Sequence, residues 1–277
     1  MAQLSNCIIV SARVLGLRKI LRRKPNSLAP QAMAGLREVL GTLKTPETAI
    51  QIEDRLLLIC PVPDDEEAGY HAQIVLAELM QELAFLQLQL AETDGLFLSG
   101  ALVLGQVLAE RTQGRYDLSG PGVRHAHRVA RDNRAPCLLF DRPLANRAAL
   151  YFDAAEPPTI WQHVQHDGWG RYFLDYLSLL SNFEPSGRSS LWAIVGHHKA
   201  AIQRKLGNER SDHPVPLAPW LSWLLCYHNR VVRRMSALPQ QFAAAEEIRR
   251  TYEIDSIRLG FAQSAALKVS PLRLVEE

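Results

Sequence analysis

The chain is short of cysteine, of net charge and of long apolar runs. Its four cysteines, Cys7, Cys60, Cys137 and Cys226, are widely spaced in 277 residues. They form neither a CxxC pair nor a Cys/His pattern, so the sequence lacks the spacing of a structural zinc site. Three of them lie inside apolar runs, which predicts buried, reduced thiols and a cytoplasmic protein.

The charge and the hydropathy pattern point to neither nucleic acid nor a membrane. The net charge of +2 gives no global field that attracts a polyanion. The longest apolar stretch, around residues 83–90, is interrupted by Gln87 and Gln89. We therefore expect no segment to reach the roughly 20 apolar residues of a membrane span. The N-terminus also lacks the basic, apolar and small-residue sections of a signal peptide, so no membrane partner is expected.

The apolar runs and turn signals of the first half predict an α+β fold. Strands are expected at residues 7–12, 48–52, 55–60, 96–107 and 137–140, and helices at 29–43, 64–92 and 123–132. Glu53-Asp54 separates two apolar runs as a tight hairpin turn does. The order β-α-β-β-α-β is the split βαβ pattern of ferredoxin-like and palm-type sheets, and we expect the helices on one face.

The composition changes after about residue 150. All five tryptophans lie beyond residue 160, and helical stretches dominate. These stretches are expected at residues 171–180, 190–206, 217–236 and 242–251. The pattern predicts an α/β domain over residues 1–150 and a helical C-terminal subdomain over 151–277 that packs on it. We expect the tryptophans to form its core, because large aromatic side chains dominate small helical cores.

Five stretches of the first half carry a resemblance to a known family. They are residues 13–17 (RVLGL), 53–54 (ED), 99–105 (SGALVLG), 116–128 (YDLSGPGVRHAHR) and 135–141 (APCLLFD). In this order they resemble the motifs of class III nucleotide cyclases. They are most similar to the small stand-alone bacterial type, which includes the pyrimidine cyclases of Pycsar anti-phage systems. The resemblance covers about residues 7–141.

The resemblance implies a role for five residues. Asp54 matches an aspartate that binds catalytic metal, and Asp117 matches the acid that reads the base. Arg128 matches the arginine that stabilises the triphosphate. Two positions depart from the family: Arg13 stands where the first metal aspartate is expected, and Arg124 replaces an asparagine. The nucleotide-binding candidates are therefore Asp117, Arg124 and Arg128.

The departure at Arg13 affects the chemistry most. Cyclisation of a nucleoside triphosphate uses metal ions held by two converging carboxylates. A guanidinium has only donors and stays protonated, so Arg13 cannot be the second ligand. We expect Arg13 to form an ion pair with Asp54 in place of the metal. Asp54 alone would then be a weak metal candidate, no residue is assigned as catalytic, and no cofactor is expected.

The sequence thus favours a catalytically degenerate class III cyclase homologue. It would act as a nucleotide-binding, regulatory or scaffolding protein, in signalling or anti-phage defence. Because class III sites form between two subunits, the resemblance implies a homodimer or a heterodimer with another cyclase-type chain. A nucleoside triphosphate or another anion would be its ligand.

Two alternatives stay open. An active cyclase would use Mg or Mn with unusual ligation, for example with Glu53 beside Asp54. A nucleic-acid or anion binding module would use two basic segments, at residues 13–24 and 111–134, as one groove. Solvated surface positions are the structural alternative for Arg128 and for both segments, and a plain turn is the alternative for Asp54. His125, His127, His197 and His198 are expected to be surface or packing residues.

Overall fold

The structure is a computed structural model of the chain. It describes residues 4–23, 28–63, 68–112, 115–146, 163–166, 170–182, 188–210, 219–237, 244–254 and 270–271.

The elements of the first half follow the predicted order. They are β1 (Leu4–Leu15), α1 (Leu17–Arg23), α2 (Leu28–Leu40), β2 (Thr48–Ile52), β3 (Arg55–Pro61), α3 (Ala68–Asp94), β4 (Phe97–Thr112), β5 (Arg115–Ser119), α4 (Pro121–Asp132) and β6 (Leu138–Phe140). The predicted hairpin between β2 and β3 is present, with its turn at Glu53 and Asp54. The segment at residues 115–119, interpreted from sequence as a polar turn region, forms β5 and pairs with the end of β4.

The elements of the second half are strands as well as helices. They are β7 (Val164–His166), β8 (Tyr172–Leu174), α6 (Tyr176–Asn182), α7 (Arg188–Arg210), α8 (Pro219–Ser236), α9 (Ala245–Tyr252) and β9 (Ser270–Pro271). The helix predicted over residues 171–180 is wrong at its start, because Tyr172–Leu174 pairs with β6 as a strand. The division of the chain near residue 150 stays a prediction.

One mixed sheet joins the strands of both halves. Its order is β2-β3-β1-β4-β6-β8-β7-β9, and β5 pairs with β4 off this path. The β4–β6 pair is parallel, and the other pairs of the described strands are antiparallel. In this register Arg13 on β1 lies opposite Arg55 on β3 and Ser99 on β4. The predicted α+β class and sheet are confirmed.

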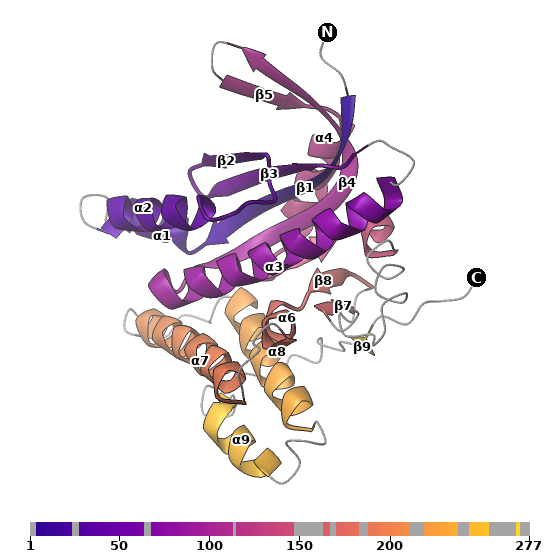
Figure 1. Ribbon diagram of the computed structural model, residues 1–277. Helices are drawn as coiled ribbons and strands as arrows, with labels where there is room; N and C mark the ends of the chain where they lie inside the picture. Colours follow the sequence, from indigo (N-terminus) through magenta and orange to yellow (C-terminus); the bar gives the residue numbers. More distant parts are fainter. Residues whose placement is uncertain are drawn as a thin grey trace.

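Helices cover both faces of this sheet rather than one. Ile8, Val10 and Leu102 face a large apolar cluster shared with α3. Ile9 and Val103, on the opposite face, belong to a smaller cluster with Val123 and Ala126 of α4. Figure 1 shows α3 in front of the sheet and α4 behind it. The expectation of helices on one face is therefore wrong. The unbroken apolar run in β1 is the sequence feature typical of a strand buried on both sides.

Close backbone approaches explain two glycines of β4. A Cβ on Gly100 would lie 2.3 Å from the carbonyl oxygen of Ser11 in β1. A Cβ on Gly105 would lie 2.6 Å from the Cα of Gly122 in α4. Glycine is required at both places because no side chain fits. The second contact lets the start of α4 approach the strand closely.

Helix α3 combines a long apolar sequence with extensive burial. Its segment His71–Thr93 is long and apolar enough to cross a membrane by length and composition, contrary to the sequence expectation. Its side chains Leu79, Leu83 and Ala84 are fully buried in the large apolar cluster. Packing against the sheet and neighbouring helices accounts for this composition, as in the core helix of a globular fold.

The second half adds its own aromatic packing to the same cluster. Phe173 of β8 makes an edge contact with Trp223, and Trp223 stacks on Tyr227 of α8 at a ring-centroid distance of 5.2 Å. Trp192 and Trp223 are buried, which confirms the expected core role for these two. Trp161 and Trp169 lie outside the described residues.

The cysteines behave as buried thiols. Cys7, Cys60 and Cys137 are buried, and none of the four cysteines forms a disulfide. Burial, with a smaller effect of Glu47, raises the pKa of Cys7 to about 11. Burial, with smaller effects of Glu82 and Cys7, raises the pKa of Cys60 to about 12. These thiols stay protonated near neutral pH and are therefore poor nucleophiles.

Candidate functional site

Arg13 lies where β1 approaches the end of α4. Its Nη2 donates a hydrogen bond of 2.9 Å to the carbonyl oxygen of Asn133. Its Nε is buried without a hydrogen-bond partner in the described part of the chain. Three residues further along, Gly16 takes a φ of 92°, and α1 begins at Leu17. Arg13 is thus held on the α4 side of the sheet.

Asn133 ties the end of α4 to the sheet. This residue is fully buried. Its Nδ2 donates to the carbonyl oxygens of Gly100 at 3.0 Å and Cys137 at 2.7 Å, and its Oδ1 accepts from the backbone N–H of Ala135 at 3.0 Å. The carbonyl oxygen of the same asparagine accepts the hydrogen bond from Arg13. We call Arg13 and Asn133 together the β1–α4 clasp.

Asp54 pairs with Arg18 and not with Arg13. Its Oδ1 lies 3.3 Å from Nη2 of Arg18, which is half exposed in α1. The predicted Arg13–Asp54 ion pair is therefore wrong. The sheet register explains the difference, because Arg13 lies opposite Arg55 and the Asp54 carboxylate falls beside α1.

The surroundings of Asp54 do not fit a catalytic metal ion. A divalent ion of this chemistry needs converging oxygen ligands. The neighbouring charged groups at this end of the sheet are instead the guanidiniums of Arg13, Arg18 and Arg55. Glu53 is exposed on the turn with a φ of 52°. Across the described ranges, no group of three His, Cys, Asp or Glu side chains is placed to hold a metal.

The α4 arginines are exposed, and they differ in their contacts. Arg128 Nη2 donates to Nδ1 of His125 at 2.9 Å. Nδ1 of His125 is then the acceptor, so its Nε2 carries the proton and donates to Oδ2 of Asp141 at 3.2 Å. Arg124 is also exposed, and its side chain makes no hydrogen bond or ion pair with the described residues.

Asp141 anchors this chain of contacts. Burial raises the pKa of its carboxyl above the usual value. The hydrogen bond from the backbone N–H of Leu144 and the nearby His125 both lower this pKa, but burial has the larger effect. The same carboxylate accepts that Leu144 N–H at 3.0 Å at the start of a helical segment. His125 therefore positions Arg128 from a fixed carboxylate, which is more than the surface role expected from sequence.

His127 and Asp117 complete the positions singled out in the sequence. Nδ1 of His127 lies 2.8 Å from Oγ of Ser11. Burial and the nearby Arg55 lower its pKa, so it is neutral at pH 7. Asp117 lies in β5 opposite Glu110, in the hairpin that projects at the top of Figure 1. Its side chain is outside the described part of the structure.

A groove beside α4 contains Arg128 but none of the other predicted site residues. Its volume is about 480 Å³. The lining residues are Arg128, Val129 and Asp132 of α4, Leu139 and Phe140 of β6, and Arg142, Gly170, Arg171 and Tyr172. The sequence analysis missed Arg142 and Arg171. Arg142 directly follows the 135–141 motif, whereas only the pairing of β8 with β6 brings Arg171 to the same place.

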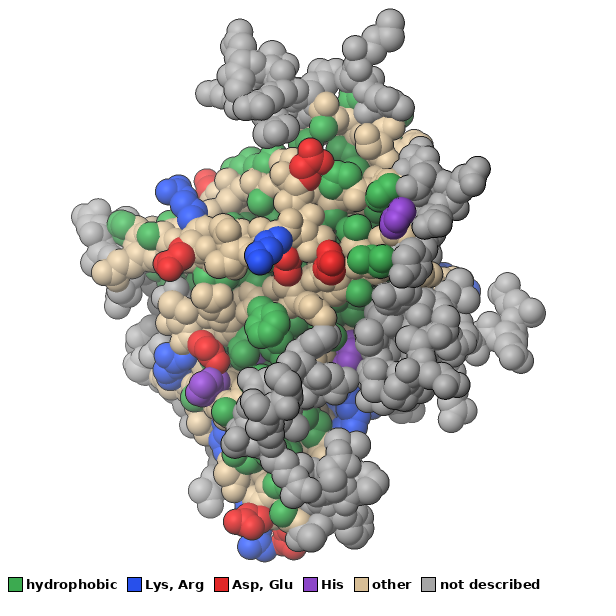
Figure 2. Space-filling view, viewed as in Figure 1, with side chains coloured by type: hydrophobic (Ala, Val, Ile, Leu, Met, Phe, Trp, Pro, Cys, Tyr) green, Lys and Arg blue, Asp and Glu red, His purple; other side chains and the backbone are tan. Residues whose placement is uncertain are grey.

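The described charged side chains do not cluster on the face of the molecule that is turned away from α4. On the face in Figure 2, the described Lys, Arg, Asp and Glu side chains are scattered, with both signs present. Arg13 lies on the α4 side, but the helices of the two basic segments pack against different faces of the sheet, since α1 joins the large apolar cluster and α4 the smaller one. Their arrangement does not support the single basic groove considered from the sequence.

Comparisons with known proteins give likenesses to cyclase structures. No family model matches the chain, and no curated protein matches it. The adenylyl cyclase CyaB from P. aeruginosa is 11% identical, over 68% of this chain and 98% of that chain, with a TM-score of 0.45. The guanylyl cyclase Cya2 is 13% identical, over 63% and 93%, with a TM-score of 0.43. A bacterial light-regulated adenylyl cyclase is 16% identical, over 63% and 92%, with a TM-score of 0.40. The solved structures to which this chain is similar thus include adenylyl and guanylyl cyclases.

Proposed function

We propose that this protein is a class III cyclase homologue that has lost cyclase activity and binds a nucleotide as a regulatory or scaffolding protein. The proposal rests on the motif resemblance of residues 7–141 and, above all, on one observation. Arg13, at the first metal position of the resemblance, is engaged with Asn133 in the β1–α4 clasp.

The state of Asp54 supports the same proposal. The carboxylate at the second metal position is already paired with the guanidinium of Arg18. Two unit charges about 4 Å apart in a partly solvated site interact by roughly 4 kcal/mol. A cation entering between Arg13 and Arg18 would meet repulsion of this order. This repulsion supports the proposed loss of the family's two-metal chemistry.

Nucleotide binding is proposed to use α4. Arg128 is exposed and oriented by His125, and Arg124 is exposed without a protein partner in the described residues. A guanidinium group can donate two parallel hydrogen bonds to the oxygens of one phosphate. By the resemblance, Asp117 would contact the base, and a second cyclase-type chain, identical or different, would complete the site. Participation in nucleotide signalling or anti-phage defence belongs to the same proposal.

Turnover and binding assays test this function together. The purified protein is incubated with ATP, GTP, CTP or UTP and with Mn²⁺ or Mg²⁺, and products are separated by chromatography. We expect no cyclic nucleotide, but we expect at least one triphosphate to bind. Arg128→Ala should weaken that binding by about tenfold or more, because a charged hydrogen bond contributes about 1.5–3 kcal/mol.

The control for charge is Arg37→Ala in α2, which removes an exposed arginine far from α4 in sequence and on another helix. It should bind the triphosphate as the wild type does. A cyclic product that disappears in Asp54→Ala would contradict the proposal and favour the active-cyclase alternative.

A nucleic-acid binding function is the second candidate. One observation favours it: Arg124, Arg128, Arg131 and Arg134 are all exposed along α4 and just after it. Binding to a single-stranded oligonucleotide that falls steeply with salt, and that changes in step with the number of these arginines removed, would support it. Salt-insensitive or absent binding would exclude it.

A further inference from the structure

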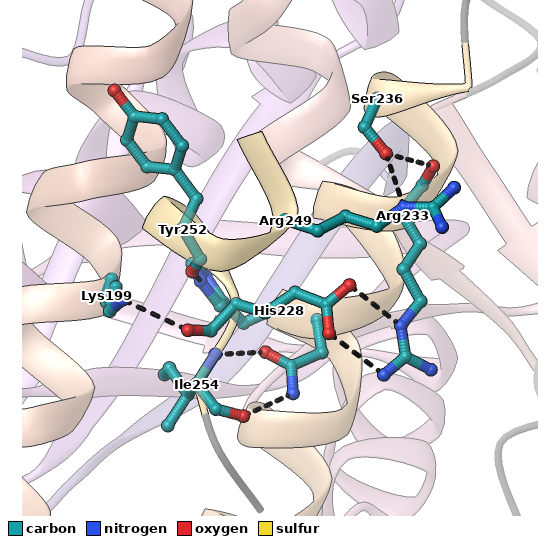
Figure 3. Close-up of polar contacts among 9 residues, drawn as sticks. Lys199, His228, Arg233, Ser236, Arg249, Tyr252 and Ile254 are labelled. Carbon is teal, nitrogen blue, oxygen red and sulfur yellow. Dashed lines mark hydrogen bonds and ion pairs between the residues drawn. The ribbon is translucent and has the colours of Figure 1, made fainter. Parts of the chain in front are cut away.

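The surface formed by α7 and α8 holds the end of α9 and the residues that follow it. Helix α9 ends at Tyr252, and the chain becomes extended at Glu253, with φ −65° and ψ 148°. Residues 251–254 contact side chains of both α7 and α8, and we call them the docked segment (Figure 3). The two helices thus bind a short stretch of chain that comes after both of them in sequence.

The backbone of the docked segment supplies most of these contacts. Nζ of Lys199 in α7 donates to the carbonyl oxygens of Thr251 at 2.7 Å and Glu253 at 3.0 Å. Nε2 of His228 in α8 donates to the carbonyl oxygen of Tyr252 at 2.9 Å. The carbonyl groups of three successive residues are therefore held by side chains of two helices.

Asn229 of α8 binds both backbone groups of Ile254. Its Nδ2 donates to the Ile254 carbonyl oxygen at 2.7 Å, and its Oδ1 accepts the Ile254 N–H at 2.8 Å. Both Asn229 and His228 are buried. A buried polar group that loses its partner costs free energy. These two side chains therefore favour a state in which a peptide backbone lies against them.

The side chains of the docked segment add selectivity. The Tyr252 ring stacks on Trp192 of α7 at a centroid distance of 4.9 Å, and Ile254 is buried in the large apolar cluster. Arg233 of α8 donates two hydrogen bonds of 3.0 Å to the Glu253 carboxylate. Main-chain hydrogen bonds combined with sites for particular side chains are typical of peptide recognition by proteins. The surface matches an aromatic, an acidic and an aliphatic residue in succession.

Helix α9 itself is attached through few apolar contacts. Of its eight residues, Ala245–Tyr252, Ile248 is the buried one. A helix of this length is not stable alone in water. Segments with few buried apolar contacts open locally at a lower free energy than the core. The docked segment is therefore able to leave the surface while α7 and α8 stay packed.

We propose that the α7–α8 surface is a peptide-binding site, and that the docked segment occupies it as a releasable internal ligand. The ligand class is a short peptide with an aromatic, an acidic and an aliphatic residue in the order of Tyr252, Glu253 and Ile254. The site lies in the C-terminal helices and does not rest on the proposed nucleotide function. A peptide of this class on another molecule would compete with the chain's own segment.

Hydrogen exchange on the wild-type full chain tests the release. Exchange of the Glu253 and Ile254 amides is compared with that of Leu224 and Val232, which are buried in α8. We expect the first pair to exchange about tenfold or more faster, with a weaker dependence on urea, because they open locally. Equal rates with equal urea dependence would mean that the segment leaves only on global unfolding, which overturns the proposal.

A labelled peptide tests the site itself. The probe has the sequence of residues 245–254, AEEIRRTYEI, with both ends capped. It is titrated into the full chain and into the full-length double variant Tyr252→Ala/Ile254→Ala, whose own segment binds weakly. We expect one peptide per chain and an affinity for the variant about tenfold or more above that for the wild type, where the linked segment competes at high effective concentration.

A charge exchange between protein and peptide gives the matched control. In the double variant, Arg233→Glu should weaken binding about tenfold, because it turns an attraction to Glu253 into a repulsion. A peptide with Glu253→Lys should bind this protein better than the original peptide does. Arg37→Glu in α2 makes the same reversal at an exposed site and should leave binding unchanged.

Peptide variants separate specific from general binding. Tyr252→Ala in the peptide removes the ring that stacks on Trp192 and should weaken binding about tenfold. Arg250→Ala in the peptide should have no effect, because Arg250 contacts only the exposed Glu246 among the described residues. Equal binding of all peptides would overturn the proposal. So would no binding to a double variant whose circular dichroism and α8 exchange rates match those of the wild type.

Discussion

Arginine is used in opposite ways on α8 and around α4. Arg234 of α8 lies 2.6 Å from Oδ2 of the buried Asp175 and also contacts Ser178. Tyr227 donates to the other carboxylate oxygen at 2.7 Å. Arg128 and Arg142 line a groove and make no ion pair with a described carboxylate. A guanidinium matched by a buried carboxylate holds the fold, whereas guanidiniums gathered without one are available to a ligand.

The C-terminal helices are joined by hydrogen bonds between side chains and backbone groups. Asn229 of α8 bonds both the N–H and the carbonyl oxygen of Ile254, at 2.8 and 2.7 Å. Lys199 of α7 donates to the carbonyl oxygens of Thr251 at 2.7 Å and Glu253 at 3.0 Å. Figure 3 shows the contacts of Ile254 with Asn229 and of Lys199 with Glu253 around the end of α9, together with the Arg233–Glu253 pair. Such local networks fix one arrangement of α7, α8 and α9.

Removal of Arg234 should have the largest effect on stability. Burial alone would raise the pKa of Asp175, but Arg234, Tyr227 and Ser178 outweigh burial and hold this pKa below its usual value. Arg234→Ala leaves the carboxylate buried without its partner, which costs about 3–5 kcal/mol. Urea unfolding followed by circular dichroism measures this loss.

The control for Arg234 lies on α9. Arg250 and Glu246 form an ion pair in which both side chains are about four-fifths exposed. Arg250→Ala should change the free energy of unfolding by less than about 0.5 kcal/mol. Equal losses for the two variants would remove the distinction between buried and exposed arginines.

Acid should weaken the C-terminal region through two buried histidines. The Tyr176 hydroxyl lies 2.6 Å from Nε2 of His198, Nδ1 of His198 lies 3.0 Å from Nδ1 of His228, and Nε2 of His228 donates to the Tyr252 carbonyl at 2.9 Å. With both rings neutral, Tyr176 donates to His198, and His198 donates to His228. Because His228 donates to the Tyr252 carbonyl, each of these groups then has a hydrogen-bond partner. Burial lowers the pKa of His198 well below its usual value and that of His228 to about 4.

The sign of the pH effect follows from these lowered values. The unfolded chain binds protons near pH 6.5, before the folded chain does, so stability is complete above this pH and falls between about pH 6.5 and 4. For His228 the difference corresponds to about 3 kcal/mol. We expect a steep fall of the unfolding free energy over this range, with His197→Ala as an exposed control that keeps the slope. A flat profile from pH 7 to 5 would contradict the prediction.

Smaller losses are expected at the β1–α4 clasp. Asn133→Ala removes three side-chain hydrogen bonds of a fully buried residue and should cost about 2–3 kcal/mol. Arg13→Met removes one hydrogen bond and an unpartnered buried Nε, and should cost about 1 kcal/mol or less. The ratio of the two losses, measured by urea unfolding, sharpens the comparison. A larger loss of unfolding free energy for Arg13→Met would show that Arg13 contributes more to stability than Asn133.

Much of the sheet could be predicted because its signals are local. The hairpin at Glu53-Asp54, the strand of residues 137–140 and the order of the first half all follow from apolar runs and turns. The partners of Arg13 could not be predicted, because strand register and the approach of α4 decide them. Arg171 reaches the groove through a strand pairing between distant segments, for which a short apolar run gives no sign.

The central question is whether the position of Arg13 excludes metal from nucleotide binding. Triphosphate affinity should be measured on the full chain in EDTA, in Mg²⁺ and in Mn²⁺, for the wild type and for Asp54→Ala. We predict that the wild type binds without a required metal and that Asp54→Ala binds equally well. Binding that needs Mn²⁺ or Mg²⁺ and is lost in Asp54→Ala would contradict this and place a functional metal beside Arg13.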